Sequence, residues 1–170
     1  MSWRVPLMRF ARRALGGMAL VVQATGVVAT PAPLDAAAWL QWVRSVREPT
    51  AVVFTASYCG SCPLAMEALL RHRRSQGVPF DVLAIELDGG DGRVPVARGH
   101  GELDGVQHRR AAEPVRALQQ AVHPRWRGET PYLVLLRSPN EVRRVLGVPS
   151  AEDLRWLTDP APVGAATAPR

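Results

Sequence analysis

Two short apolar runs, separated by a helical pattern, predict the centre of the fold. The runs from Ala51 to Thr55 and from Phe80 to Leu87 are rich in β-branched and aliphatic side chains, as buried strands are. The apolar residues between them recur at helical spacing: Leu64, Ala65, Ala68 and Leu69. We expect this helix to begin at or just after Cys59 and to run to about Arg74, before Gln76-Gly77 ends it. Because strand, helix and strand follow each other so closely, they form a βαβ unit with parallel strands.

Weaker patterns on both sides predict another helix and a hairpin. A helix is expected over Leu34 to Arg47, where Asp35 can cap the first turn. Its apolar stripe consists of Trp39, Leu40, Val43 and Val46. Two strands, Tyr132 to Arg137 and Glu141 to Val148, flank the turn sequence Ser138-Pro139-Asn140. Strands joined by such a tight turn form an antiparallel hairpin.

The remaining segments are assigned from their glycine, proline and helix-capping residues. The stretch from Asp88 to Gln107 is rich in glycine and charged residues, and we expect it to form a long surface loop or a functional flap. Alternatively, Val94 to Val96 within it form a short edge strand. The stretch from Arg110 to Val122 predicts a helix that Pro114 either starts or kinks. A closing helix is expected over Ser150 to Leu157, where Ser150 is the cap and Asp153 follows three residues later.

Both ends differ in composition from the expected domain, residues 34–158. Residues 1–29 begin with a segment that contains four arginines and continue with a moderately apolar stretch that ends in Val27-Val28-Ala29. This pattern is typical of a signal peptide, here cleaved after Ala29 or after Ala32. The alternative is an uncleaved membrane anchor. Export would place the protein in the periplasm or otherwise outside the cytoplasm, with membrane contact only if the segment is uncleaved. Residues 159–170 are rich in Ala, Pro and Gly, and are expected to be disordered.

The formal net charge of +6 does not indicate nucleic-acid binding. All 21 basic residues are arginines, and four of them lie in the first 13 positions. Without that segment, 17 arginines face 15 acids, a net charge of +2. The later arginines are scattered among acids, as on a solvated surface. We therefore expect no nucleic-acid partner.

The two cysteines of the chain lie in the sequence Cys59-Gly60-Ser61-Cys62, between the first strand and the helix. Two such thiols can close a small disulfide ring and open it again, and the positive end of the helix dipole favours a thiolate on Cys59. Pro63 fits this placement, because proline is tolerated in a first helical turn. Two other uses stay open: half of a zinc site, although the four histidines lack a paired spacing, or a static disulfide, although so short a loop stabilises little.

This stretch resembles the active-site segment of the thioredoxin superfamily: strand, aromatic residue, C-x-x-C, helix. The resemblance implies an α/β, thioredoxin-like fold, with a mixed four- or five-stranded sheet and helices on both faces. Thr130-Pro131 stands directly before the third strand, where thioredoxin-like proteins have a cis-proline. The resemblance implies that Pro131 lies against the C-x-x-C and that the backbone of Thr130 binds the substrate peptide. Tyr58 is expected to shield one side of the site, and Trp126 to pack in the core or a loop.

By this resemblance the chain is a thiol–disulfide oxidoreductase acting on protein thiols or disulfides in the cell envelope, with Cys59 attacking and Cys62 resolving. It implies no cofactor and no metal, and a redox partner in the envelope. One departure is that Val53 stands where thioredoxins have a buried acid, while Glu67 is expected at the surface. The roles of oxidant, isomerase and reductant all stay open. The alternatives are a redox-inactive thioredoxin-like binding module and the zinc-binding protein.

Overall fold

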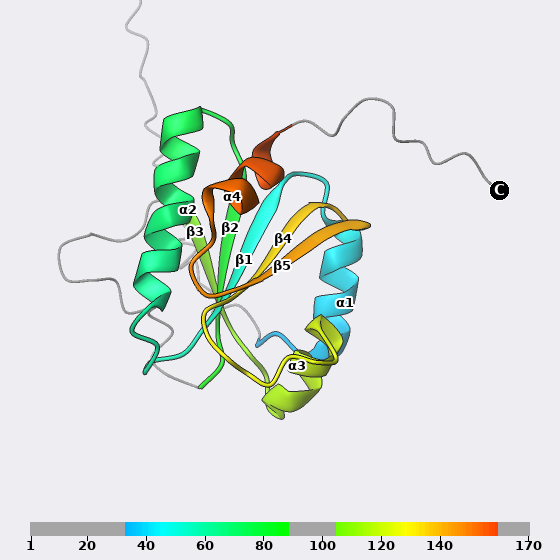
Figure 1. Ribbon diagram of the computed structural model, residues 1–170. Helices are drawn as coiled ribbons and strands as arrows, with labels where there is room; N and C mark the ends of the chain where they lie inside the picture. The colour runs from blue at the N-terminus through cyan, green and yellow to red at the C-terminus, as the bar shows by residue number, and fades with distance from the viewer. Residues whose placement is uncertain (1–32, 89–104, 160–170) are drawn as a thin grey trace, which may run out of the picture. The chain divides into compact units, whose positions relative to one another are not determined.

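The computed structural model describes residues 33–88 and 105–159 (Figure 1). Its helices are α1 (Ala36–Ser45), α2 (Cys62–Gln76), α3 (Val115–Val122) and α4 (Ala151–Thr158). Its strands are β1 (Thr50–Thr55), β2 (Asp81–Glu86), β3 (Val106–Arg110), β4 (Tyr132–Ser138) and β5 (Glu141–Leu146). The expectations for the signal segment 1–29, for Val94 to Val96 and for residues 160–170 of the tail lie outside the described residues.

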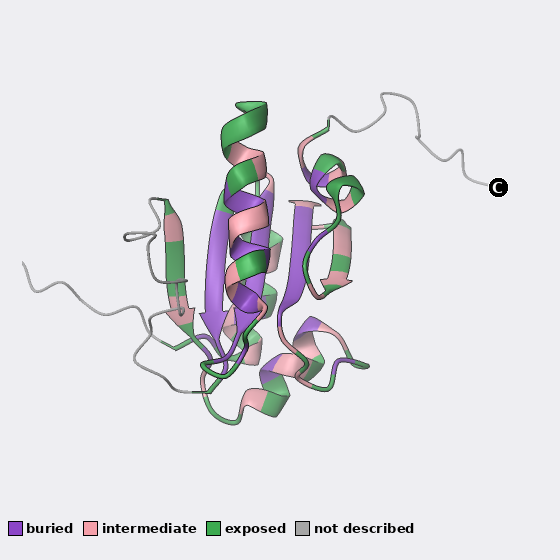
Figure 2. Ribbon diagram, turned by 60° about the vertical axis from the view of Figure 1, so that its left-hand side comes forward, coloured by how far each residue is buried: buried purple, intermediate pink, exposed green. Residues whose placement is uncertain are grey.

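The strands form one mixed sheet in the order β3-β2-β1-β4-β5. The central strand β1 pairs in parallel with β2 and antiparallel with β4. At the two edges, β3 is parallel to β2, and β5 forms an antiparallel hairpin with β4. The predicted βαβ unit and the predicted hairpin are therefore both confirmed. Every residue of β1 is buried, as the burial colours of Figure 2 show for the central strands.

Helices cover both faces of this sheet (Figure 1). α1 and α3 pack on one face, over side chains that include Phe54 and Ile85. α2 and α4 pack on the other face, over side chains that include Val53 and Leu133. Successive strand residues project to opposite faces, so β1 contributes to both cores. This is the thioredoxin-like fold that the family resemblance implied.

The helix boundaries follow from local hydrogen bonds. The Asp35 carboxylate accepts a bond of 2.7 Å from the amide of Ala38 and so caps α1, as expected. At α4, the Ser150 hydroxyl accepts from the Asp153 amide, while the Asp153 carboxylate accepts from the Ser150 amide. Two free amides of the first turn are thereby satisfied by one pair of side chains. α2 ends at Gly77, whose φ of 63° is the left-handed conformation that glycine adopts without strain.

One strand was missed by the sequence analysis. β3 takes two residues from the expected loop, which we had extended to Gln107, and Arg110 from the expected helix. α3 begins only at Val115, directly after Pro114. The sequence of β3, VQHRR, has no apolar alternation, because an edge strand bonds to a neighbour on one side only and leaves most of its side chains in solvent.

Two leucines predicted to lie in apolar helical stripes are instead exposed. The exposed fraction is 46% for Leu40 and 56% for Leu64. Each is adjacent to a residue that does face the core, Trp39 and Ala65 respectively. Consecutive helical residues point about 100° apart, so the two members of such a pair seldom face the same core.

Candidate active site

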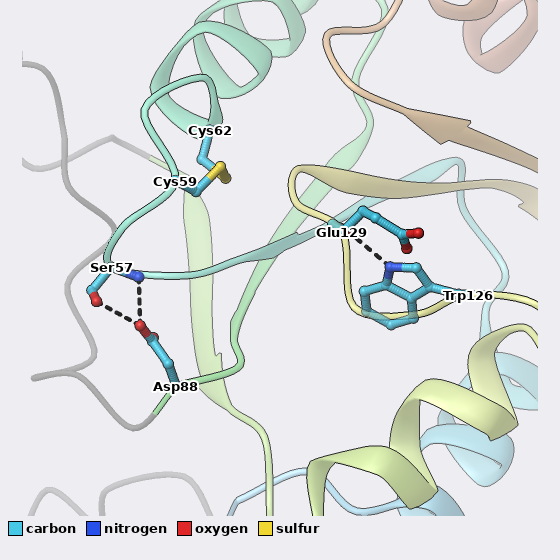
Figure 3. The surroundings of a disulfide bond; sticks show 6 residues. All are labelled: Ser57, Cys59, Cys62, Asp88, Trp126 and Glu129. Atoms are coloured by element: carbon cyan, nitrogen blue, oxygen red, sulfur yellow. Dashed lines mark hydrogen bonds between the residues drawn. A yellow bond between two sulfur atoms is a disulfide. The ribbon is translucent and has the colours of Figure 1, made fainter.

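The two cysteines are joined by a disulfide where β1 leads into α2 (Figure 3). Cys62 is the first residue of α2, and its amide donates a hydrogen bond of 3.2 Å to the carbonyl of Cys59. Cys59 lies one turn earlier and is held by a 3.0 Å bond from its amide to the carbonyl of Ala56. The first cysteine is 7% exposed and the second 1%. Cys59 is thus the more accessible of the two cysteines.

The beginning of α2 provides a favourable electrostatic setting for a thiolate. Ser61 occupies the cap position but makes no side-chain bond to the helix amides. Pro63 lies in the first turn and has no amide hydrogen to satisfy. The positive end of the helix dipole can therefore act on a sulfur at this position.

The predicted cis peptide bond between Thr130 and Pro131 is present, directly before β4. In the antiparallel ladder, Tyr132 pairs with Phe54 of β1, so Pro131 lies one position further toward the segment that leads to Cys59. Pro131 is buried, and its carbonyl accepts a 2.8 Å hydrogen bond from the amide of Gly147. The sheet register thereby places Thr130–Pro131 at the same end of the sheet as the cysteines, although the two motifs are about 70 residues apart in the sequence.

Trp126 packs beside the loop that contains Thr130 and Pro131 and is hydrogen-bonded to it. Its indole N–H donates a hydrogen bond of 2.9 Å to the carbonyl of Glu129 (Figure 3). The indole ring stacks on Tyr132, with ring centroids 4.5 Å apart, and packs on Phe54 at 4.9 Å. Trp126 is 5% exposed, in agreement with the expected core or loop packing.

Tyr132 links the aromatic cluster of Phe54, Trp126 and Tyr132 to the end of α3. Its hydroxyl and the Nδ1 atom of His123, the residue that follows α3, lie 3.1 Å apart in a hydrogen bond. Burial raises the pKa of the Tyr132 phenol above its usual value; the Arg144 guanidinium opposes this effect and the Glu129 carboxylate adds to it. The phenol therefore stays protonated over the whole physiological range and serves as a fixed hydrogen-bonding group.

A second set of hydrogen bonds, between Asp88 and Ser57, holds the segment that precedes Cys59. One carboxylate oxygen of Asp88 accepts bonds from the amide of Ser57, at 2.9 Å, and from its hydroxyl, at 2.5 Å (Figure 3). Burial raises the pKa of Asp88, but these hydrogen bonds outweigh it, so that the pKa is lowered overall. Ser57 lies two residues before Cys59. The end of β2 is thereby tied to the segment that carries the first cysteine.

Two exposed apolar side chains flank the cysteines in the sequence. Tyr58, immediately before Cys59, is 78% exposed, and Leu64 follows Cys62 by two residues. Large apolar groups at the surface beside this disulfide are suited to contact another protein. The sequence analysis expects Tyr58 to shield one side of the site, and Leu64 to face the core.

A buried acid was missed by the sequence analysis. Glu86, the last residue of β2, is 4% exposed and pairs in register with Thr55 of β1 and with Arg110 of β3. Paired residues project to the same side of a sheet, which here is the side covered by α2. An acid within the apolar run FDVLAIEL was the signal that could have revealed it. Glu67, by contrast, forms a 2.6 Å surface ion pair with Arg71, as expected.

The described residues contain no group of three histidine, cysteine or acidic side chains placed to hold a metal ion. Of the four histidines, His72 contacts the hydroxyl of Thr158 at 3.0 Å, and His123 contacts Tyr132. Within residues 33–88 and 105–159, no helix is both long and apolar enough to cross a membrane.

No protein-family model matches this sequence, and no curated protein matches it. Solved structures of thioredoxin-like proteins are similar in fold. DsbF of Mycobacterium tuberculosis, in mixed oxidised and reduced forms, is 13% identical over 65% of this chain and 78% of its own, with a TM-score of 0.42. A thiol:disulfide interchange protein of the thioredoxin family from Chlorobium tepidum is 15% identical over 69% and 81%, with a TM-score of 0.45.

A third similar structure is the exposed lipoprotein thioredoxin Etrx1 of Streptococcus pneumoniae. It is 11% identical over 69% of this chain and 86% of its own, with a TM-score of 0.45. With identities this low and TM-scores below 0.5, the activity, substrate and location of this chain have to be inferred from its own residues.

Proposed function

We propose that this protein is an exported thiol–disulfide oxidoreductase that acts on protein thiols or disulfides. The observation that carries the proposal is the Cys59–Cys62 disulfide at the start of α2, at the sheet end where the cis Thr130–Pro131 segment enters β4. A disulfide that spans only two residues closes too small a loop to stabilise the fold appreciably by restricting the unfolded chain. Its value to the protein is therefore chemical.

In the reduced protein, Cys59 is the attacking thiolate. It is the more exposed of the two cysteines, and it precedes α2, whose positive dipole end stabilises negative charge. Its sulfur attacks a client disulfide, forms a mixed disulfide and releases the other client sulfur as a thiolate. Cys62 then attacks the Cys59 sulfur, which frees the client as a dithiol and leaves Cys59–Cys62 oxidised. Two electrons pass from this protein to the client, and the reverse sequence oxidises a client dithiol.

The client chain is held by groups around the disulfide. The Thr130 backbone, which precedes the buried Pro131, is the proposed hydrogen-bonding edge. Tyr58 offers an exposed aromatic ring next to the attacking cysteine. We assign substrate contact to these three residues and catalysis to Cys59 and Cys62.

The proposed location is the cell envelope. The arginine-rich, moderately apolar residues 1–29 have the features of an export signal, cleaved or retained as an anchor. Disulfides persist outside the cytoplasm, and a redox-active pair there requires a partner that restores its redox state. That partner, like the client, is proposed by its chemistry alone: a protein carrying a dithiol or a disulfide.

Trapping of mixed disulfides tests the assigned roles. In the full chain, Cys62→Ser removes the resolving thiol, so client proteins should accumulate on Cys59 as covalent complexes that dithiothreitol releases. Cys59→Ser is the matched control and should trap few, because Cys62 is 1% exposed. Equal trapping by the two variants would refute the roles, and no trapping by either would favour a redox-inactive binding module.

The reduction potential of the pair decides the direction of electron flow. The full chain is equilibrated with glutathione buffers, and the fraction of the Cys59–Cys62 disulfide is measured at each ratio. A value near about −270 mV would indicate a reductant and one near about −120 mV a strong oxidant. Failure to form the disulfide at any ratio would overturn the proposed function.

A further inference from the structure

A basic groove lies beside the Thr130–Pro131 loop and takes no part in the proposed exchange chemistry. Its volume is about 190 Å³, and it is lined by Arg116, Gln119, Gln120, Pro124, Trp126 and Arg127. Two arginines and two glutamines provide hydrogen-bond donors from two sides. None of the six lining residues is an acid. The groove is thus suited to a carboxylate.

Trp126 connects the groove to the client-binding loop. One part of the residue lines the groove, while its indole N–H holds the carbonyl of Glu129, the residue before Thr130. Arg127 and Thr130 are separated by only two residues, so their Cα atoms lie at most about 11 Å apart. An extended peptide covers that distance in three to four residues. A client chain bound at Thr130 can therefore reach the groove with a side chain near its cysteine.

The charge of the surrounding sequence favours the same occupant. Residues 115–130, which carry the groove and the loop, contain three arginines and a single acid. That acid, Glu129, is turned back onto its own loop, where its carboxylate accepts a 2.9 Å hydrogen bond from the amide of Arg127. The alternative is that these arginines are merely solvated, as surface charges commonly are. Their position in a groove next to the loop distinguishes Arg116 and Arg127 from such scattered charges.

We propose that the clients of this protein carry one or more acidic side chains within about three to four residues of the reacting cysteine, and that Arg116 and Arg127 bind them. This inference rests on the proposed function. The redox step is unchanged: the Cys59 thiolate attacks a sulfur of the client, one S–S bond breaks, another forms, and the displaced sulfur leaves as a thiolate. The groove contributes to binding of the client and so to the second-order rate constant of this step.

Two cysteine peptides test the proposal. Both carry the cysteine as a mixed disulfide with nitrothiobenzoate, whose release is followed by absorbance. One has glutamates three and four residues from the cysteine on both sides, and the other has glutamines there. Each reacts with reduced full-length Cys62→Ser protein, so that only the attack by Cys59 is measured. This readout does not depend on whether the native pair is an oxidant or a reductant.

The acidic peptide should react about 3- to 10-fold faster at low ionic strength, since each exposed ion pair contributes at most a few-fold. The ratio should approach one near 1 M salt, where charges are screened beyond about 3 Å. Arg116→Gln/Arg127→Gln should abolish the preference without changing the rate of the glutamine peptide. The control Arg74→Gln/Arg155→Gln removes the same charge from exposed positions on α2 and α4, and should keep the preference.

Equal rates of the two peptides with the unmodified groove would overturn the inference and leave the proposed function standing. An equal loss of preference in the control variant would overturn it too, because the overall charge would then be responsible. Binding of the protein to anionic vesicles through Arg116 and Arg127, with no preference between the peptides, would assign the groove to a membrane surface instead. If neither peptide is attached to Cys59, the proposed function itself fails.

Discussion

The indole nitrogen of Trp126 donates a hydrogen bond of 2.9 Å to the carbonyl oxygen of Glu129. This bond joins the aromatic cluster beneath the sheet end to the loop that we propose binds the client chain. The ring itself is fixed by Tyr132 and Phe54. The indole N–H thus holds the loop backbone relative to β1, the strand that leads to Cys59.

We expect Trp126→Phe to keep most of the ring packing but lose this hydrogen bond. The variant should slow the attack of Cys59 on a peptide-bound disulfide about 2- to 10-fold, and should not change its attack on a small disulfide. Trp42→Phe, in α1, is the matched control, because Trp42 packs on Trp39 at 5.4 Å, away from the loop. Stopped-flow measurements with both kinds of disulfide test this. A similar loss for both kinds would mean that Trp126 acts on stability rather than on positioning.

The hydrogen bonds between Asp88 and Ser57 should protect the Ser57 amide from hydrogen exchange. Asp88→Ala removes the acceptor of the Ser57 amide, so exchange of that amide should accelerate about tenfold or more. Ser57→Ala removes only the hydroxyl and should leave the amide protected. Because the pKa of Asp88 is lowered in the folded protein, the protection should persist down to about pH 4 and disappear as the pH falls through the lowered pKa. Unchanged exchange in Asp88→Ala would show that the carboxylate does not order this segment.

Gly128 should tolerate a side chain less well than Gly77. Its φ is 97°, and an added Cβ would lie 2.7 Å from the Nε2 atom of Gln119. Gly77 has a φ of 63°, and an added Cβ would meet nothing within 4 Å. Gly128→Ala should cost about 1–3 kcal/mol of unfolding free energy and also slow the reaction with peptides, whereas Gly77→Ala should cost about 1 kcal/mol without affecting the reaction. Guanidinium unfolding and the peptide rate constants measure both effects.

Asp153 should make the stability of the protein depend on pH. Its carboxylate accepts bonds from the Ser150 amide, at 3.0 Å, and from Arg143, at 3.1 Å. Burial raises its pKa, but the bonds from Ser150 and then Arg143 outweigh this and lower it. A lowered folded-state pKa stabilises the protein above the unfolded pKa near 4, and the effect is lost as the pH falls through the folded value. Asp153→Asn should therefore cost about 1 kcal/mol at pH 7, and the difference should shrink below pH 4.

Glu152 is the control for Asp153. The Glu152 carboxylate is 3.5 Å from the guanidinium of Arg143, but the Glu152 side chain is 77% exposed. Glu152→Gln should change the unfolding free energy by less than about 0.5 kcal/mol at any pH, as is usual for a solvated ion pair. Equal effects of the two substitutions would contradict the role of the capping box.

Much of the architecture could be predicted because it depends on neighbours in the sequence. β1 and β2 are buried on both faces, so each appears as an unbroken apolar run. Asp35 and Ser150 cap their helices through bonds to amides three residues away. The cysteine pair and Pro63 mark the start of α2 in the same local way.

The misses share one physical cause, which is dependence on partners far along the chain. β3 is a strand because its backbone pairs with β2, although its own side chains are mostly polar. Leu64 was expected to face the core, but its neighbour Ala65 occupies that direction. No local pattern distinguishes such cases from a loop or from a buried helical residue.

The sequence by itself determined the cysteine pair, its place before a helix and the order of most elements, since each depends on adjacent or periodically spaced residues. Only the tertiary structure decided what surrounds the pair. The register of β1 with β4 brings Pro131 toward the cysteines, and that of β1 with β2 buries Glu86 on the α2 side. The turn after α3 places Trp126 under the Glu129 carbonyl. These contacts join segments that come together only when the sheet forms, because hydrogen bonds between strands do not depend on their separation in the sequence.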